Sequence, residues 1–176
     1  MKPTLETERL VLRPQAESDT VELMAMSMDP EVMQFIGDGA MTLRESEELT
    51  LETLEMAGSL GRWIVTERAT GQFLGWAVLT HLDDSEDIEI GYGFKVSAWG
   101  RGFATEATRR LLRHGFDDLG LREVVAVSRP ENTASHKVLE KAGLRRHGLR
   151  DAFGLRGLYF FVARADAPLA SYTNLH

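Results

Sequence analysis

The amino-acid sequence predicts a single α/β domain in which a mixed sheet carries helices on both faces. Stretches rich in β-branched and aromatic residues alternate with stretches whose apolar residues recur at helical spacing. The 176 residues suffice for one domain with its own core, and they contain no internal repeat or Pro/Gly-rich linker. We therefore expect one domain over residues 1–176, with an irregular tail over 165–176.

The first part of the chain predicts one strand and then helices. Residues 9–13 alternate in the manner of a strand, and the apolar residues of 21–28 recur at helical spacing. Asp29–Pro30 predicts a second short helix, because aspartate is a common N-cap and proline fits the first helical position. Thr42 and Glu45 form a capping-box pattern that predicts the start of the next helix.

The middle and end of the chain predict a meander of three strands followed by alternating helices and strands. Turn signals separate the β-rich stretches of the meander, at 63–67, 73–80 and 88–94. After them we expect a helix over 102–118, a strand over 122–127, a helix over 132–142 and a late strand over 155–164. Asn132 is the expected N-cap and Gly143 the expected stop of the last helix.

Composition and charge exclude several classes of protein. The formal net charge is −7, whereas a general nucleic-acid binder needs a basic surface, so we expect no nucleic-acid partner. There is no cysteine, which excludes disulfides, thiolate metal sites and a cysteine nucleophile. We find no signal peptide and no apolar run long enough for a membrane helix, so we expect no membrane partner and a cytoplasmic location. The histidines show no metal-ligand spacing, and no metal is expected.

A Gly-rich turn joins the strand over 88–94 to the helix that follows it. Residues 99–105 read Trp-Gly-Arg-Gly-Phe-Ala-Thr, which leaves little side-chain bulk where the helix begins. Because the first backbone N–H groups of a helix have no internal acceptor, such a turn is suited to an anion such as a pyrophosphate. The P-loop ending is absent, and Thr105 stands where a Rossmann turn needs a third glycine. A strand–helix connection without any ligand would show the same glycines.

Together with their flanks, these residues resemble the GCN5-related N-acetyltransferase (GNAT) superfamily, and within it the ribosomal-protein N-terminal (RimJ/RimL-like) branch. The superfamily loop reads Gln/Arg-x-x-Gly-x-Gly/Ala, and here Trp99 takes the Gln/Arg position. Residues 7–13 resemble the first strand of the branch, and the resemblance extends over nearly the whole chain through 88–93, 132–135 and 141–144. It implies a mostly antiparallel sheet that splays between the fourth strand, continuing to about Val96, and the fifth.

The resemblance also implies acetyl-CoA as co-substrate, held in that splay. The pantetheine arm would pair with the backbone of Phe94–Val96, and Asn132 and Ser135 would contact it. The pyrophosphate would lie on the backbone N–H groups of the turn, at Arg101, Gly102, Phe103, Ala104 and Thr105. Arg101 and Lys137 are the cations expected to reach the outer phosphates, whereas Arg109, Arg110 and Arg113 are expected on a solvated helix face.

The implied reaction is direct transfer of an acetyl group to a primary amine in a ternary complex. The amine must lose a proton before it attacks, and Glu89 is the candidate base. The backbone N–H of Val96 is the candidate group for polarising the thioester carbonyl. Ser135 is a candidate donor to the leaving thiolate, because Leu139 occupies the position where many relatives carry a tyrosine acid. Alternatively, Glu89 is a solvated strand residue and Asn132 only an N-cap.

Three questions stay open at the level of sequence. The missing tyrosine leaves a non-catalytic acyl-CoA-binding module or sensor as an alternative to an enzyme. The acceptor amine is either a protein N-terminus or a small molecule, and Met24, Met26 and Met28 are equally plausible as core or as pocket lining. The aromatic stretch at 159–161 either belongs to a core strand or supplies the apolar edge of a homodimer.

Overall fold

In the computed structural model, which describes residues 2–55 and 58–167, eight strands form one sheet. Their order is β1-β2-β3-β4-β5-β6-β8-β7, and within the described residues every neighbouring pair is antiparallel except the parallel pair β5 and β6. This confirms the predicted mixed, mostly antiparallel sheet. The strands are β1 (Leu5–Glu6), β2 (Leu10–Pro14), β3 (Gly61–Glu67), β4 (Phe73–His81), β5 (Ile88–Phe94), β6 (Glu123–Ser128), β7 (Arg145–Ala152) and β8 (Leu155–Ala163).

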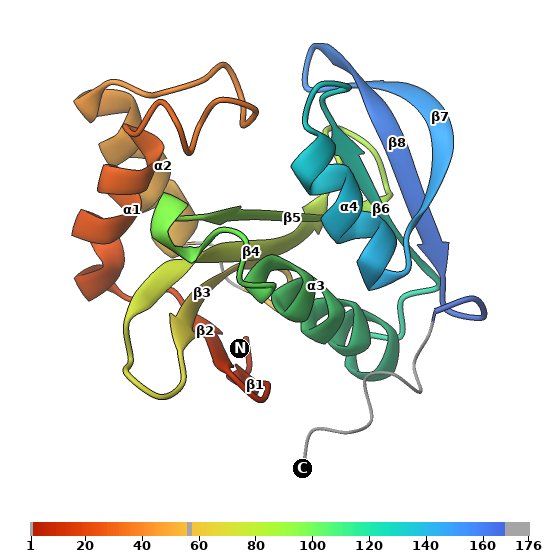
Figure 1. Cartoon of the computed structure of the whole chain (residues 1–176), viewed down its shortest axis with the longest axis horizontal. Helices are drawn as coiled ribbons and strands as arrows, with labels where there is room; N and C mark the ends of the chain where they lie inside the picture. Colours follow the sequence, from red (N-terminus) through yellow and green to blue (C-terminus); the bar gives the residue numbers. More distant parts are fainter. Residues whose placement is uncertain (1, 56–57, 168–176) are drawn as a thin grey trace.

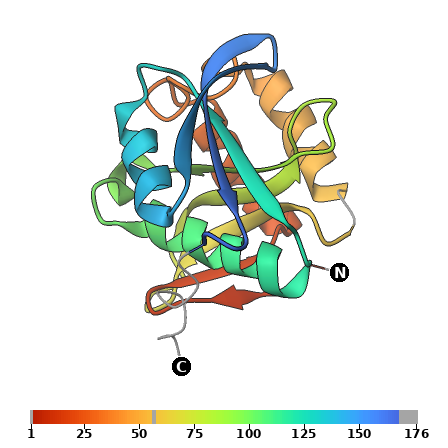
Figure 2. The ribbon, with the colours of Figure 1, turned by 90° about the vertical axis from the view of Figure 1, so that its right-hand side faces the viewer.

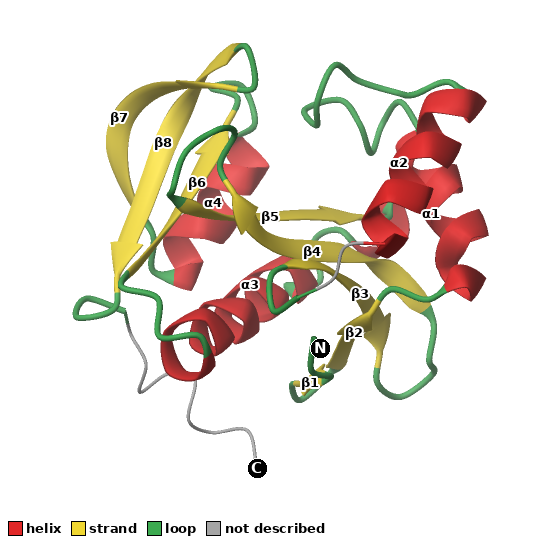
Figure 3. Cartoon of the chain, turned by 180° about the vertical axis from the view of Figure 1, so that it is seen from behind, coloured by secondary structure: helices red, strands yellow, loops and turns green. Residues whose placement is uncertain are grey.

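Helices cover both faces of the sheet, as predicted. They are α1 (Thr20–Ser27), α2 (Leu43–Glu55), α3 (Phe103–Arg113) and α4 (Thr133–Ala142). Successive residues of a strand point to opposite faces, and β3 shows the result: Trp63 and Val65 pack in the cluster of α3, whereas Ile64 packs in the cluster of α1. Figures 1 and 3 show α1 and α2 together at one end of the molecule, with α4, β6, β7 and β8 at the other end.

The short helix predicted at Asp29–Pro30 is wrong. The chain forms successive turns there, although Asp29 Oδ1 accepts from the backbone N–H of Glu31 at 2.9 Å in the manner of a cap. Glycines at positions 37 and 39 have positive φ angles of 53° and 104°, and Met41 N donates back to Ser27 O at 2.8 Å. This return to α1 requires a loop, so a helix cannot propagate.

The C-terminal part of the chain contains two strands, β7 and β8. Because β8 lies between β6 and β7, its aromatic residues do not form a free edge, and Phe160 is fully buried in the main core. Figure 2 views the molecule from this side, with β6, β7 and β8 in front and α4 beside them. Residues 164–167 form a turn, and the rest of the predicted tail, 168–176, lies outside the described residues.

The helix predicted over 102–118 is α3 followed by a π-helical turn, η3 (His114–Asp118). His114 Nδ1 lies 2.7 Å from Asp118 Oδ2, and Gly115 O accepts from Leu121 N at 2.9 Å, so the wider turn redirects the chain toward β6. Over the described residues, no helix is both long and apolar enough to cross a bilayer.

Candidate active site

The parallel strands β5 and β6 meet at a single register pair, Glu89 with Val125, and then diverge (Figure 1). Beyond that point, no strand among the described residues pairs with this edge of β5. Lys95 N donates to Leu74 O on β4 at 2.9 Å. Since alternate residues of a strand direct their backbone groups to opposite edges, Tyr92 and Phe94 direct theirs toward the diverging β6. An extended ligand can therefore pair with this edge as a strand would.

The fourth strand of the predicted fold ends earlier than expected. β5 stops at Phe94, and Val96 begins a short 3₁₀ helix, η2 (Val96–Ala98), so the strand does not continue to Val96. Trp99 closes this turn, because its indole Nε1–H donates to Phe94 O at 2.8 Å. As the first residue of η2, Val96 has a backbone N–H with no acceptor inside that helix. The turn thus ties the end of β5 to the Gly-rich segment that follows.

The Gly-rich segment forms the N-terminus of α3, as predicted. Gly100 and Gly102 have positive φ angles of 70° and 81°, and Gly102 is the N-cap of the helix. The first helical bond runs from Glu106 N to Gly102 O at 3.1 Å, so the backbone N–H groups of 103–105 have no acceptor in the helix. Among the described residues no side chain caps this end, and the N–H groups with the helix dipole form an anion site.

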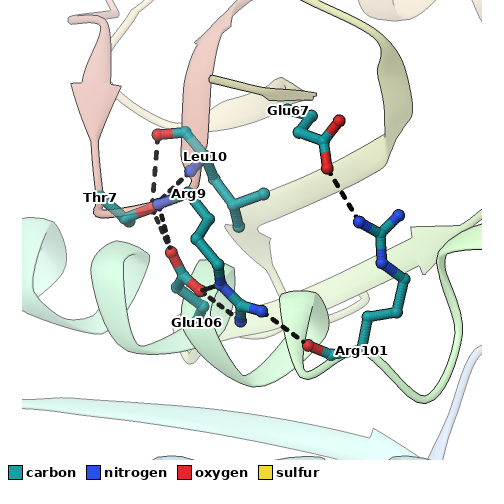
Figure 4. A network of polar contacts seen from close by, with 6 residues as sticks. All are labelled: Thr7, Arg9, Leu10, Glu67, Arg101 and Glu106. Atoms are coloured by element: carbon teal, nitrogen blue, oxygen red, sulfur yellow. Dashed lines mark hydrogen bonds and ion pairs between the residues drawn. The ribbon is translucent and has the colours of Figure 1, made fainter. Parts of the chain in front are cut away.

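A polar network fixes this helix start to the first hairpin (Figure 4). Glu106 accepts from Thr7 Oγ1 at 2.6 Å and from Arg9 at two atoms, its backbone N at 3.0 Å and its Nε at 2.8 Å. Arg9 Nη1 in turn donates to the carbonyl of Arg101 at 2.9 Å. The network joins residues about a hundred positions apart in the chain and holds the backbone of the Gly-rich turn in place.

Replacing Glu106 with alanine is expected to lower the free energy of unfolding by about 2 kcal/mol, because the change leaves several donors without their charged acceptor. Chemical denaturation followed by circular dichroism measures this. Glu48→Ala is the matched control: Glu48 pairs with Arg44 at 2.8 Å, but both side chains are largely exposed, so we expect a change within about 0.5 kcal/mol. Equal losses in the two variants would contradict the assigned role of Glu106.

The N-terminus of α4 faces the same region. Asn132 is its N-cap, as predicted, and its Oδ1 accepts from Ser135 N at 3.1 Å, which leaves the side-chain amide free to donate elsewhere. Sequence reasoning missed Tyr92, whose hydroxyl lies 2.9 Å from Ser135 Oγ. Tyr92 is on β5 and Ser135 on α4, so this contact crosses the divergence of β5 and β6. Only the folded structure brings the two residues together.

Glu89 lies at the point where β5 and β6 meet. Its neighbours Ile88 and Ile90 belong to the core cluster on the α3 side, so Glu89 points to the opposite face, that of α1 and α2. Burial raises the pKa of the Glu89 carboxyl to about 7, and the negative charge of Asp83 adds to the shift. A carboxyl group with such a pKa exchanges protons near neutral pH, which a general base requires.

The predicted phosphate-binding cations occupy different environments. Lys137 is exposed on α4, whereas the Arg101 guanidinium pairs with Glu67 at 2.9 Å and stacks on the ring of Phe103. Arg109 donates to the carbonyl of Lys141 at 2.6 Å and Arg110 to that of Glu6 at 3.2 Å, so both connect helix α3 to neighbouring elements. The side chain of Arg101 is therefore already engaged by Glu67 and Phe103.

The arrangement of a splayed parallel pair with a Gly-rich helix start beside it can be compared with known proteins. A family model for the GNAT acetyltransferase domain matches residues 9–145. The chain belongs to the GNAT acetyltransferase family. It is an enzyme of the acyltransferase class, and the sequence resemblance to this family is confirmed.

A curated relative is FsC-acetyl coenzyme A-N(2)-transacetylase of Aspergillus fumigatus, which is 35% identical over 156 residues. That match covers 81% of this chain and 65% of the relative, so the chain spans less than two thirds of the relative's length. Among solved structures, an acetyltransferase from Agrobacterium tumefaciens has a TM-score of 0.83 at 26% identity, covering 93% of this chain and 96% of that one.

Mycobacterium smegmatis RimJ, solved in complex with CoA-disulfide, has the same fold as this chain. Its TM-score is 0.79 at 22% identity, covering 94% of this chain and 90% of that chain. In the described part of the chain, no group of three or more histidine, aspartate or glutamate residues lies close enough together to hold a metal ion.

Proposed function

We propose that this GNAT enzyme transfers the acetyl group of acetyl-CoA to a primary amine, which attacks the thioester directly in a ternary complex. The observation that carries the proposal is the edge of β5 that no described strand pairs with. This edge lies between two groups that suit the proposed reaction. One is the anion site at the start of α3, and the other is Glu89 at the meeting point of the strands. A coenzyme that extends from the anion site along β5 places its thioester near Glu89, the proposed base.

The coenzyme is held largely by backbone groups in this proposal. The pyrophosphate lies on the N–H groups of Arg101, Gly102, Phe103, Ala104 and Thr105, while the pantetheine arm runs along β5 at Phe94. Asn132 donates its side-chain amide to the arm, since the oxygen of that amide already caps α4. Lys137, exposed on α4, contributes charge toward the outer phosphates. We propose acetyl-CoA as the co-substrate because relatives of this fold bind CoA.

Three groups of the chain, at Glu89, Val96 and Ser135, perform the separate steps of the proposed transfer. Glu89 takes a proton from the attacking amine, directly or through water, since an alkyl ammonium cannot attack. The N–H of Val96 donates to the thioester oxygen, on which negative charge develops. Ser135 donates a hydrogen bond to the sulfur as the C–S bond breaks. Separate groups thus polarise the thioester carbonyl, deprotonate the amine and stabilise the leaving thiolate.

An assay of CoA thiol release with a panel of amines, beside calorimetry with CoA, tests the function. We expect CoA to bind and turnover to require an amine. Short peptides with a free α-amine and small molecules such as polyamines or aminoglycosides distinguish the two classes of acceptor. Binding without turnover on any amine would favour an acyl-CoA-binding module, and an absence of binding would refute the proposal.

Replacing Asp83 with asparagine is expected to move the acidic limb of the pH profile of kcat/KM to lower pH. Because the charge of Asp83 raises the pKa of Glu89, its removal lets the base ionise earlier. Burial is the larger cause, so we expect a shift of roughly half a unit. Asparagine suits the positive φ of 51° at this position and can still accept from Phe153 N. Asp84→Asn is the control and should leave the limb in place.

A further inference from the structure

Tyr92 and Ser135 form a hydrogen-bonded pair that connects β5 with α4. The Tyr92 hydroxyl lies 2.9 Å from Ser135 Oγ and 3.2 Å from the carbonyl oxygen of Ser135. The phenol ring is partly buried against the main core, beside Phe94 at a centroid distance of 6.5 Å. The packing of the Tyr92 ring on β5 therefore fixes its hydroxyl, which contacts the Ser135 side chain on α4.

Either oxygen of this pair can be the donor, and the Tyr92 hydroxyl can also donate to the carbonyl oxygen of Ser135. Burial raises the pKa of the Tyr92 phenol above its ordinary value, and this outweighs the opposite effect of the bond to Ser135. Tyr92 therefore keeps its proton over the working range and is able to donate it to Ser135 Oγ. When it donates to Ser135 Oγ, the proton of the serine hydroxyl is left to point at a third group. Without it, a serine at this place can turn back to a carbonyl of its own helix.

The position of the pair identifies that third group. Tyr92 is three residues beyond Glu89, which is about 10 Å along a strand, and it lies on the α3 side of the sheet. Glu89 points to the other side. A coenzyme arm that enters from the start of α3 passes Val96 and Phe94 and runs along β5 toward Glu89, so a thioester whose oxygen accepts from Val96 N presents its sulfur on the side of Tyr92. Glu89 then acts on the amine from one face of the sheet, and the Tyr92–Ser135 pair acts on the leaving sulfur from the other face.

We propose that Tyr92 is a positioning residue for transfer: it holds the Ser135 hydroxyl so that the serine proton points at the coenzyme sulfur. This rests on the proposed function and deepens it. As the nitrogen–carbon bond forms, the C–S bond breaks and its electron pair goes to sulfur. The amine proton goes to Glu89, and the thiolate is stabilised by the hydrogen bond from Ser135 until solvent protonates it. Tyr92 itself loses no proton in the cycle.

A double-mutant cycle with Tyr92→Phe and Ser135→Ala tests the pair. Each variant is expected to lower kcat about tenfold, the loss of one positioned hydrogen bond, with KM for acetyl-CoA changed less than about twofold. The double variant should be no slower than Ser135→Ala, because Tyr92 acts only through the serine. A double variant about a hundredfold slower than the wild type, or a Tyr92→Phe variant with normal kcat, would overturn the proposal.

Tyr159→Phe is the control for loss of a tyrosine hydroxyl. Tyr159 lies on β8 beside Arg150, with the guanidinium 5.1 Å from its ring centroid, and we expect its kcat to match that of the wild type. Phenylalanine keeps the ring of Tyr92 in the core, and denaturation curves check that both variants fold.

A second measurement does not depend on turnover. The ultraviolet absorbance of the thiolate reports the pKa of bound CoA, and Tyr92→Phe and Ser135→Ala should raise that pKa by the same amount, about one unit. An unchanged thiol pKa in Tyr92→Phe would overturn the positioning role even if no acceptor is found. Failure of the proposed function appears differently, as a wild type that binds no CoA.

Discussion

Replacing Glu89 with glutamine is expected to lower kcat by a factor of about 10²–10⁴ and to leave the affinity for acetyl-CoA nearly unchanged. Glutamine keeps the size and the polarity of the side chain but cannot take a proton, so the variant removes only the general base. The wild-type profile of kcat/KM should rise with pH through about 7, where Glu89 ionises. The acidic limb due to Glu89 should be missing in the variant. Steady-state rates over a pH series measure both effects.

The stability of the same variant shows whether Glu89 is placed as the structure has it. Its pKa is raised on folding from 4.5 to about 7, so the folded state binds the proton more tightly than the unfolded chain. This group therefore stabilises the wild type fully below pH 4.5 and loses that contribution as pH rises through about 7. At pH well above 7 we expect Glu89→Gln to be more stable than the wild type by about 3 kcal/mol.

Controls separate a lost base from other losses. Glu86→Gln changes an exposed carboxyl of the preceding loop and should leave the rate and the pH profile as they are. Calorimetry with CoA should give the same affinity for Glu89→Gln as for the wild type. If Glu89→Gln keeps a rate within a few fold of the wild type on the preferred amine, Glu89 is a strand residue without a proton-transfer role and another group is the base.

Local signals in the sequence predicted the parts of the site that depend on neighbouring residues. Gly102 and Asn132 begin helices because glycine accepts a left-handed conformation and asparagine caps a helix through its own side chain. Glu89 alternates with Ile88 and Ile90 along the chain, and on β5 it lies on the face away from them. These features need little more than the periodicity of a strand or a helix.

The parts that sequence reasoning missed depend on contacts between distant segments. Tyr92 meets Ser135, 43 positions away, only because α4 packs beside the diverging strands. Arg101 binds Glu67 across 34 positions, and no local pattern indicates that this cation turns away from the phosphate site. The helix predicted at Asp29–Pro30 failed for a related reason, since the bond from Met41 to Ser27 selects a loop over the helix that local preference favours.

Replacing Gly102 with valine is expected to weaken CoA binding about a hundredfold. Gly102 has φ +81°, which β-branched residues adopt only with strain, and a Cβ there would lie 3.4 Å from Arg9 Nη2. The turn must therefore rearrange, and the N–H groups of 103–105 no longer converge on one anion. Since these groups act together, a loss of their alignment costs several hydrogen bonds to the pyrophosphate at once. Calorimetric titration with CoA measures the loss.

Two further variants distinguish loss of the anion site from loss of the fold. Gly102→Asn should keep most of the affinity, because asparagine adopts left-handed angles at small cost. Gly120→Val places the same strain, at φ +68° and in open space, near the other end of the α3–η3 segment. It should lower the free energy of unfolding by about 1–2 kcal/mol without changing CoA affinity. If Gly102→Val and Gly120→Val bind CoA equally well, the N-terminus of α3 does not hold the pyrophosphate, and the coenzyme must be anchored through α4 and the edge of β5.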